Sequence, residues 1–283
     1  MTKPSLLLVN AFQLSPGSGY TLRPPSGDRE TLVMDYANVA PHLGDVDWDV
    51  HPGAPASHGD HPVETREEFL IVSANRIRVV REACEKGGWD AIVLLGGGDP
   101  GFTESVEIGR RFGIPVTSCA HAQMHLATML GHRFGIVDIS ETHNVQMARL
   151  VVEYRFTEHC AGIRNIDFPL PRPANKGRPS ISEERTKALR GEASAMLDAA
   201  VSAAEASIEE DGAESIILGC SAAYWMRPFL QDRLAAAGWD VPVLEGYSSA
   251  IEMAKLMLRV QLTASGLAYP MDPPKRSRRR KLV

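Results

Sequence analysis

The sequence predicts an α/β protein with two pseudo-symmetric, Rossmann-like lobes, each a short and mainly parallel sheet flanked by helices. Short apolar runs of strand length alternate with longer stretches of helical periodicity, as in a parallel sheet with crossover helices. The pattern also occurs twice, because GGWDAIVLLGGGDP (87–100) and DGAESIILGCSAA (211–223) both run through an apolar strand to a turn of small residues. We therefore expect the active site between the lobes, beyond the carboxyl ends of the strands.

Seven apolar runs predict strands, at residues 5–10, 48–51, 91–96, 115–118, 134–139, 215–219 and 241–245. Apolar residues at helical spacing predict helices over 68–85, 120–130 and 183–210. Residues 1–125 with 247–270 would form the first lobe and 126–246 the second. Two stretches rich in Gly and Pro, at 13–28 and 168–179, are interpreted as connections or lids that help to shape the pocket.

Length and composition set the class of protein. A chain of 283 residues with 44% hydrophobic residues can bury a full core, which excludes disorder throughout. No apolar run approaches the roughly 18 residues that span a bilayer, and the first residues do not resemble a signal peptide. Four cysteines without paired CxxC spacing favour free thiols in a reducing compartment. We expect a cytoplasmic protein without a membrane partner.

The net charge of −5 is unevenly distributed. Six basic residues, Lys275, Arg276, Arg278, Arg279, Arg280 and Lys281, lie in the last nine positions, which leaves 24 Lys and Arg against 35 Asp and Glu in the rest. An acidic body repels phosphate backbones, so nucleic acid is not the expected partner. The tail over 271–283 has no apolar periodicity and is interpreted as a disordered, solvated end.

Cys220 is the strongest candidate for chemistry. It ends an apolar strand at a tight turn, where the backbone N–H groups of Ser221 and Ala222 could receive an anion and favour a thiolate. Such a thiolate could exchange a proton with a carbon next to a carbonyl group. The alternative is a buried cysteine that packs as a small apolar residue.

The first half has a matching turn of small residues, Gly96, Gly97, Gly98 and Asp99. These glycines would let a ligand approach the backbone, or would only permit a turn with positive φ. The turn lacks the GxGxxG and Gly-Lys-Ser/Thr patterns, so a nucleotide site is poorly supported.

The segment CAHAQMH contains Cys119, His121 and His125. The two histidines are four residues apart and could share a helix face, as metal ligands do, but no further ligand is fixed by the sequence. We expect no metal and prefer His121 as an acid/base residue. A metal hydrolase that uses both histidines stays open as an alternative.

Several segments, in their order along the chain, resemble the aspartate/glutamate/hydantoin racemase superfamily. They include GGDPG, PVTSCAHAQMHLATMLGHRFGIVDI, DGAESIILGCSA and PVLEGYSSAIEMAK. The resemblance covers residues 5–260 and is nearest to the hydantoin and allantoin racemase branch. It implies two lobes with one catalytic cysteine each, no cofactor and a homo-oligomer. The implied substrate is a small carboxylate or cyclic amide whose α-carbon exchanges a proton.

Carried over by position, Cys220 matches the second-lobe cysteine, whereas the first-lobe cysteine of hydantoin racemases falls on Gly96. Asn10, Thr117 and Ser118 match residues that bind the substrate in parts of the superfamily. His121 replaces a residue that is often Glu. These residues, with Gly96, Gly97, Asp99, Ser221 and Ala222, form the expected site.

A glycine cannot supply the second base of a two-base racemase. Cys119 or His121 could replace the missing cysteine. Otherwise the reaction could be one-sided, as the resemblance to arylmalonate decarboxylases implies, or an isomerisation like that of maleate isomerases. A non-catalytic relative that binds a small acid is the alternative from another class. We expect a racemase or epimerase first and a one-cysteine decarboxylase or isomerase second.

Overall fold

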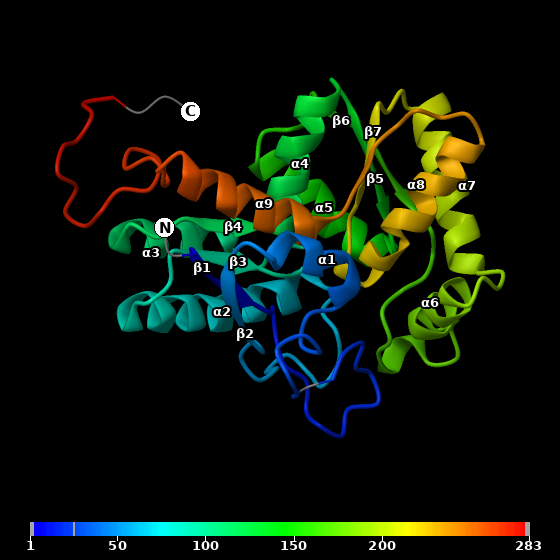
Figure 1. Ribbon diagram of the computed structural model, residues 1–283, viewed down its shortest axis with the longest axis horizontal. Helices are drawn as coiled ribbons and strands as arrows, with labels where there is room; N and C mark the ends of the chain where they lie inside the picture. The colour runs from blue at the N-terminus through cyan, green and yellow to red at the C-terminus, as the bar shows by residue number, and fades with distance from the viewer. Residues whose placement is uncertain (1–2, 25, 281–283) are drawn as a thin grey trace.

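The computed structural model describes residues 3–24 and 26–280, and it contains two four-stranded parallel sheets flanked by helices (Figure 1). The first sheet has the order β2-β1-β3-β4 and the second the order β6-β5-β7-β8. All of the strand pairs are parallel, and both sheets place their strands in the same relative order. The expected two-lobed α/β fold is therefore confirmed. The strands are β1 (Ser5–Val9), β2 (Asp47–His51), β3 (Ala91–Leu94), β4 (Val116–Ser118), β5 (Phe134–Asp138), β6 (Cys160–Asn165), β7 (Ser215–Leu218) and β8 (Val243–Leu244).

Helices cover both faces of each sheet. They are α1 (Tyr36–Leu43), α2 (Arg66–Lys86), α3 (Phe102–Phe112), α4 (Cys119–Leu130), α5 (Glu141–Glu153), α6 (Ile181–Leu189), α7 (Ala195–Glu209), α8 (Arg227–Ala236) and α9 (Gly246–Arg259). Two short 3₁₀ helices, η1 (Pro173–Asn175) and η2 (Ser221–Met226), complete the set for the described residues.

Strand β1 shows why the first sheet is buried on both faces. Successive side chains point to opposite faces, and here Leu6 and Leu8 pack with α1 and α9 while Leu7 and Val9 pack with α2 and α3. Each fully buried Leu contributes about 1.5–3 kcal/mol through the hydrophobic effect. In the second sheet, Ile136 faces α4 and α5. The continuous apolar strands of the sequence follow from this arrangement.

Two sequence expectations about elements were wrong. The stretch over 183–210 forms α6 and α7 rather than one helix, because the chain turns at Gly191 with a φ of 72° and restarts at Ser194, whose hydroxyl accepts the Leu197 N–H. Strand β6 was missed, since its sequence CAGIRN has no apolar run and the strand is only partly buried at the sheet edge.

The C-terminal segment leaves α9 on the side of α3, where Gly266 lies close to the Arg110 side chain (Figure 1). Residues 270–280 form no helix or strand, and Lys281 of the basic tail lies outside the described residues. Among the described residues, no helix is long and apolar enough to cross a membrane. The lobe boundaries, including the one placed within α4, stay a prediction.

Candidate active site

One cavity lies where strands of both sheets end. The loops after β1, β3 and β7 contribute its walls, and the expected pocket-shaping loops contribute Leu14, Arg23 and Leu170. The lining residues are mostly apolar or glycine, with few polar groups, as in many small-molecule sites. They are Ala11, Phe12, Leu14, Thr21, Leu22, Arg23, Met34, Pro62, Val63, Phe69, Gly96, Gly97, Gly98, Pro100, His143, Leu170, Cys220, Ser221 and Ala222.

Cys220 lies in the cavity wall between β7 and η2, with 4% of its surface exposed. The glycine loop after β3 packs directly against its backbone. A Cβ atom added at Gly97 would lie 2.2 Å from the Gly219 carbonyl oxygen and 2.7 Å from the Cys220 Cα. The two matching turns of the sequence therefore touch each other, and they can do so only because residue 97 has no side chain.

His143 and Asp138 stand behind the thiol. The Asp138 carboxylate, at the buried end of β5, lies 2.8 Å from His143 Nδ1 in the first turn of α5, and the Cys220 side chain is in hydrogen-bond contact with His143. Burial lowers the pKa of His143, but Asp138 and Cys220 outweigh it and hold that pKa well above its ordinary value. The arrangement is that of a nucleophile or acid, a base and a carboxylate that orients the base.

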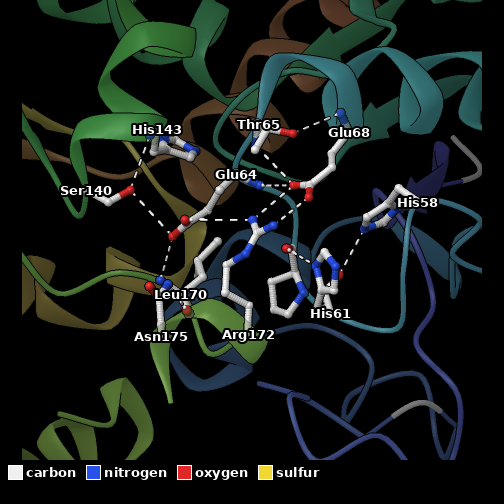
Figure 2. Close-up of polar contacts among 11 residues, drawn as sticks. His58, His61, Glu64, Thr65, Glu68, Ser140, His143, Leu170, Arg172 and Asn175 are labelled. Atoms are coloured by element: carbon white, nitrogen blue, oxygen red, sulfur yellow. Dashed lines mark hydrogen bonds and ion pairs between the residues drawn. The ribbon is translucent and has the colours of Figure 1, made fainter. Parts of the chain in front are cut away.

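A polar network holds the first turn of α5 and the loop that contains Leu170 in place (Figure 2). The Ser140 hydroxyl accepts the His143 N–H at 3.2 Å and donates to Glu64 at 3.5 Å. The same Glu64 oxygen accepts the Leu170 N–H at 2.8 Å. These bonds connect the segment before α2 to the element that holds His143 and to one cavity wall.

Arg172 completes this network. Its guanidinium donates two bonds to the Glu68 carboxylate, at 2.6 and 3.0 Å, and lies 3.8 Å from Glu64 (Figure 2). Glu68 also accepts the N–H groups of Glu64 and Thr65, which closes a capping box on α2. The chain on both sides of the cavity is thereby joined by charge-assisted hydrogen bonds.

A buried arginine holds the opposite wall. Arg76 of α2 is fully buried and donates to the backbone carbonyls of Val9, Leu95 and Pro100. It thus ties the ends of β1 and β3 to the glycine loop. Gly96 there has a φ of 135°, which L side chains rarely adopt, and its Cβ position is 3.4 Å from the Ala11 Cβ.

Five of the residues expected in the site line the cavity, namely Gly96, Gly97, Cys220, Ser221 and Ala222. The other six of the expected residues are not among the lining residues. Asn10, Thr117 and Ser118 are buried and direct their polar groups to Leu32, Ala250 and Asp99 respectively.

Asp99 supports the fold of this region. Its carboxylate accepts the N–H groups of Ala120 and His121 at the start of α4 and the hydroxyls of Ser118 and Tyr154. An aspartate near a helix N-terminus is favourable for the helix dipole.

Cys119 and His121 lie beside this carboxylate. Cys119 is fully buried, its thiol donates to the Leu94 carbonyl at 3.3 Å, and burial raises its pKa well above the ordinary value. The His121 ring packs between Phe102 and Tyr154, and burial lowers its pKa to about 3. His121 and His125 do share a helix face, with their Nε2 atoms 3.1 Å apart.

Sequence reasoning missed the partners of Cys220. The sequence assigns His143 no role beside Cys220, and the structure places it in the first turn of α5, which begins at Glu141. A signal was present, because Asp138 ends an apolar strand and the histidine follows five residues later in the first turn of a helix. Arg23 had no comparable signal in its loop.

The chain matches known proteins along most of its length. The family model described as Asp/Glu/Hydantoin racemase matches residues 55–254. A hydantoin racemase from Rhizobium meliloti is 30% identical over 189 residues, which are 66% of this chain and 68% of that protein.

The chain belongs to the Asp/Glu/hydantoin racemase family.

Solved structures have the same fold. Allantoin racemase from Pseudomonas fluorescens superimposes with a TM-score of 0.69 at 20% identity, over 99% of both chains. A variant of arylmalonate decarboxylase with one glycine changed to cysteine and one cysteine to serine superimposes with a TM-score of 0.56 at 15% identity, over 91% of this chain and 92% of that one. Both likenesses concern the two-lobed architecture.

Proposed function

We propose that this protein is a cofactor-independent racemase or epimerase that moves a proton at the carbon α to a carboxylate or cyclic amide carbonyl. The observation that carries the proposal is the contact of Cys220 with His143, which Asp138 orients, at the wall of the cavity. The membership of the racemase family, whose relatives include hydantoin racemases, supports the same reaction class.

The chemistry follows from these three side chains. The Cys220 thiolate removes the α-proton, and the electron pair of the C–H bond moves into an enolate. Because the enolate is planar and Gly96 supplies no second acid, the enolate turns over in the cavity before the Cys220 thiol returns a proton, which then adds to the opposite face and inverts the α-carbon. His143 exchanges protons with Cys220 between turnovers. Asp138 stabilises the imidazolium form of His143, which in turn favours the thiolate.

A second candidate is a one-cysteine decarboxylase, because the wall opposite the thiol offers no second acid. Among the described lining residues, the titratable groups are Cys220, His143 and Arg23, and the first-lobe position is Gly96. In this reaction the bond from the α-carbon to a carboxylate breaks, carbon dioxide leaves, and the electron pair stays on the substrate as an enediolate. Cys220 then protonates that carbon from one face, and the imidazolium of His143 restores the thiol.

Proton exchange in heavy water tests both reactions. We expect the wild type to incorporate deuterium at the α-carbon of a 5-substituted hydantoin, an N-carbamoyl amino acid, an α-amino acid or a substituted malonate, with the products analysed by NMR and chiral chromatography. Racemic product supports the racemase, whereas carbon dioxide release with deuterium on one face supports the decarboxylase.

The Cys220→Ser variant is the decisive comparison. A hydroxyl is nearly isosteric with a thiol but a far weaker acid, so we expect turnover to fall at least a thousandfold with the melting temperature unchanged. Cys160→Ser is the matched control, because Cys160 is a partly buried cysteine of strand β6 outside the cavity. Full activity in Cys220→Ser would contradict the proposal.

A further inference from the structure

Arg23 is a charged side chain of the cavity to which the proposed reaction assigns no role. It lies in the loop between β1 and α1, and its Nη2 atom donates to the backbone carbonyls of Phe12 at 2.6 Å and Pro52 at 3.1 Å. Phe12 itself lines the cavity. These two bonds hold the guanidinium at the wall and use only one of its three nitrogens.

No carboxylate of the described residues pairs with this guanidinium. Two other arginines near the site do have one, since Arg172 pairs with Glu68 and Arg185 with Asp35 at 2.6 Å. The lining residues of the cavity include neither Asp nor Glu. Arg23 therefore faces a cavity in which it is the uncompensated charge.

The desolvation of the Arg23 guanidinium has a free-energy cost. Desolvation lowers the pKa of Arg23, and the nearby Tyr247 opposes that shift. A guanidinium nevertheless stays protonated in proteins. A partly buried charge without a counter-ion is unfavourable, so an anion that enters the cavity gains a charge-assisted hydrogen bond and reduces this penalty.

The rest of the wall defines the other part of the ligand. Leu14, Leu22, Met34, Phe69 and Leu170 present hydrocarbon surface to the same space. Such a wall excludes strongly hydrated groups and receives an aliphatic or aromatic substituent.

We infer that Arg23 selects an anionic substrate, a carboxylate that carries an apolar substituent, over a neutral cyclic amide. A carboxylate can accept charge-assisted hydrogen bonds from the guanidinium nitrogens that the two backbone carbonyls leave free, and these bonds are stronger than the bond that a neutral amide carbonyl accepts. This inference rests on the proposed function, in which the α-carbon of the same molecule reaches Cys220. It separates the substrate from that of the hydantoin racemases named above.

A matched pair of ligands tests the charge alone. N-carbamoylphenylalanine is the ring-opened acid of 5-benzylhydantoin, so the two share their apolar group and differ in the carboxylate. We expect the inactive Cys220→Ser variant to bind the acid at least tenfold more tightly than the hydantoin in isothermal titration calorimetry. Phenylmalonate, a second carboxylate, should also bind more tightly than the hydantoin.

Substitutions of Arg23 test whether this residue causes the preference for the acid. We expect Arg23→Met, in the Cys220→Ser background, to weaken binding of the acid at least tenfold and binding of the hydantoin less than twofold, with Arg23→Lys between. Arg29→Met is the control, because Arg29 lies in the same loop but stacks on Trp48, 4.3 Å from the ring centre, outside the cavity. Equal binding of the two ligands, or an equal loss of both in Arg23→Met, would overturn the inference.

The two proposals fail separately. Arg23-dependent binding of the acid without any α-proton exchange in the wild type would support the inference and contradict the proposed function. Exchange on the hydantoin that is unaffected by Arg23→Met, without a preference for the acid, would contradict the inference and leave the function intact.

Discussion

At the scale of single residues, His143 decides whether Cys220 is more than a buried thiol. We expect His143→Gln to lower kcat about a hundredfold or more, because general acid–base groups typically contribute factors of that size. The rate of alkylation of Cys220 at pH 7, followed by mass spectrometry of its peptide, should also fall, since the imidazolium that favours the thiolate is lost.

His159→Gln is the control for this change, because His159 is exposed and its Nδ1–H donates to the His132 carbonyl at 3.0 Å, away from the cavity. An unchanged alkylation rate in His143→Gln, even with reduced activity, would show that His143 does not activate the thiol.

The predictability of the site from sequence differs from residue to residue. Cys220 and the glycines of the matching turn each follow a buried strand directly, so the local sequence pattern alone places them at the carboxyl ends of the strands and in the cavity wall. His143 and Arg23 reach the same cavity from a helix and a long loop. Their positions depend on packing between segments far apart in the chain, which periodicity does not encode.

At the scale of elements, the contact between the loop after β3 and the start of η2 should set the position of Cys220. We expect Gly97→Ala to destabilise the protein by about 1–3 kcal/mol, because the added methyl group would overlap the Gly219 carbonyl and force the two loops apart. Activity should fall at least tenfold with it. Urea unfolding and α-proton exchange measure the two effects.

Gly44→Ala gives the matched comparison. Gly44 ends α1 in the right-handed helical region, with φ −66° and ψ −25°, and nothing lies within 4 Å of its Cβ position. Alanine there should leave activity unchanged and alter stability by less than about 1 kcal/mol. A Gly97→Ala variant as active as Gly44→Ala would argue against the close contact of the two loops.

The elements themselves were predicted best where burial is complete on both faces. Strands β1, β3, β5 and β7 carry unbroken apolar runs for that reason. The boundary between α6 and α7 was missed because Gly191 is one glycine in an otherwise helical pattern. The new start is fixed by the capping bond of Ser194 with the Leu197 N–H and by the bond that Ser194 donates to Glu184 of the preceding helix.

At the scale of the whole molecule, the two halves are joined across the cavity by the ion pair of Glu68 on α2 with Arg172, which follows β6 (Figure 2). Burial raises the pKa of Glu68, but the bonds from Arg172 and from the N–H groups of Glu64 and Thr65 outweigh it and hold the pKa at about 2. The carboxylate is thus more acidic in the folded protein than in the unfolded chain, where it titrates near 4.5.

The sign of the pH effect follows from this difference. A carboxylate whose folded pKa is depressed stabilises the fold above its unfolded pKa and loses that contribution as the pH falls toward the folded value. We expect Glu68→Gln to lower the free energy of unfolding by about 1–3 kcal/mol at pH 7, since hydrogen bonds to charged groups have this strength. The difference in this free energy between the variant and the wild type should narrow between pH 4.5 and 2. Glu67→Gln, an exposed neighbour on the same helix turn, should differ little from the wild type at any pH. Urea unfolding at a series of pH values measures all three proteins, and a cost of Glu68→Gln that does not change with pH would mean that the ion pair does not hold the two halves together.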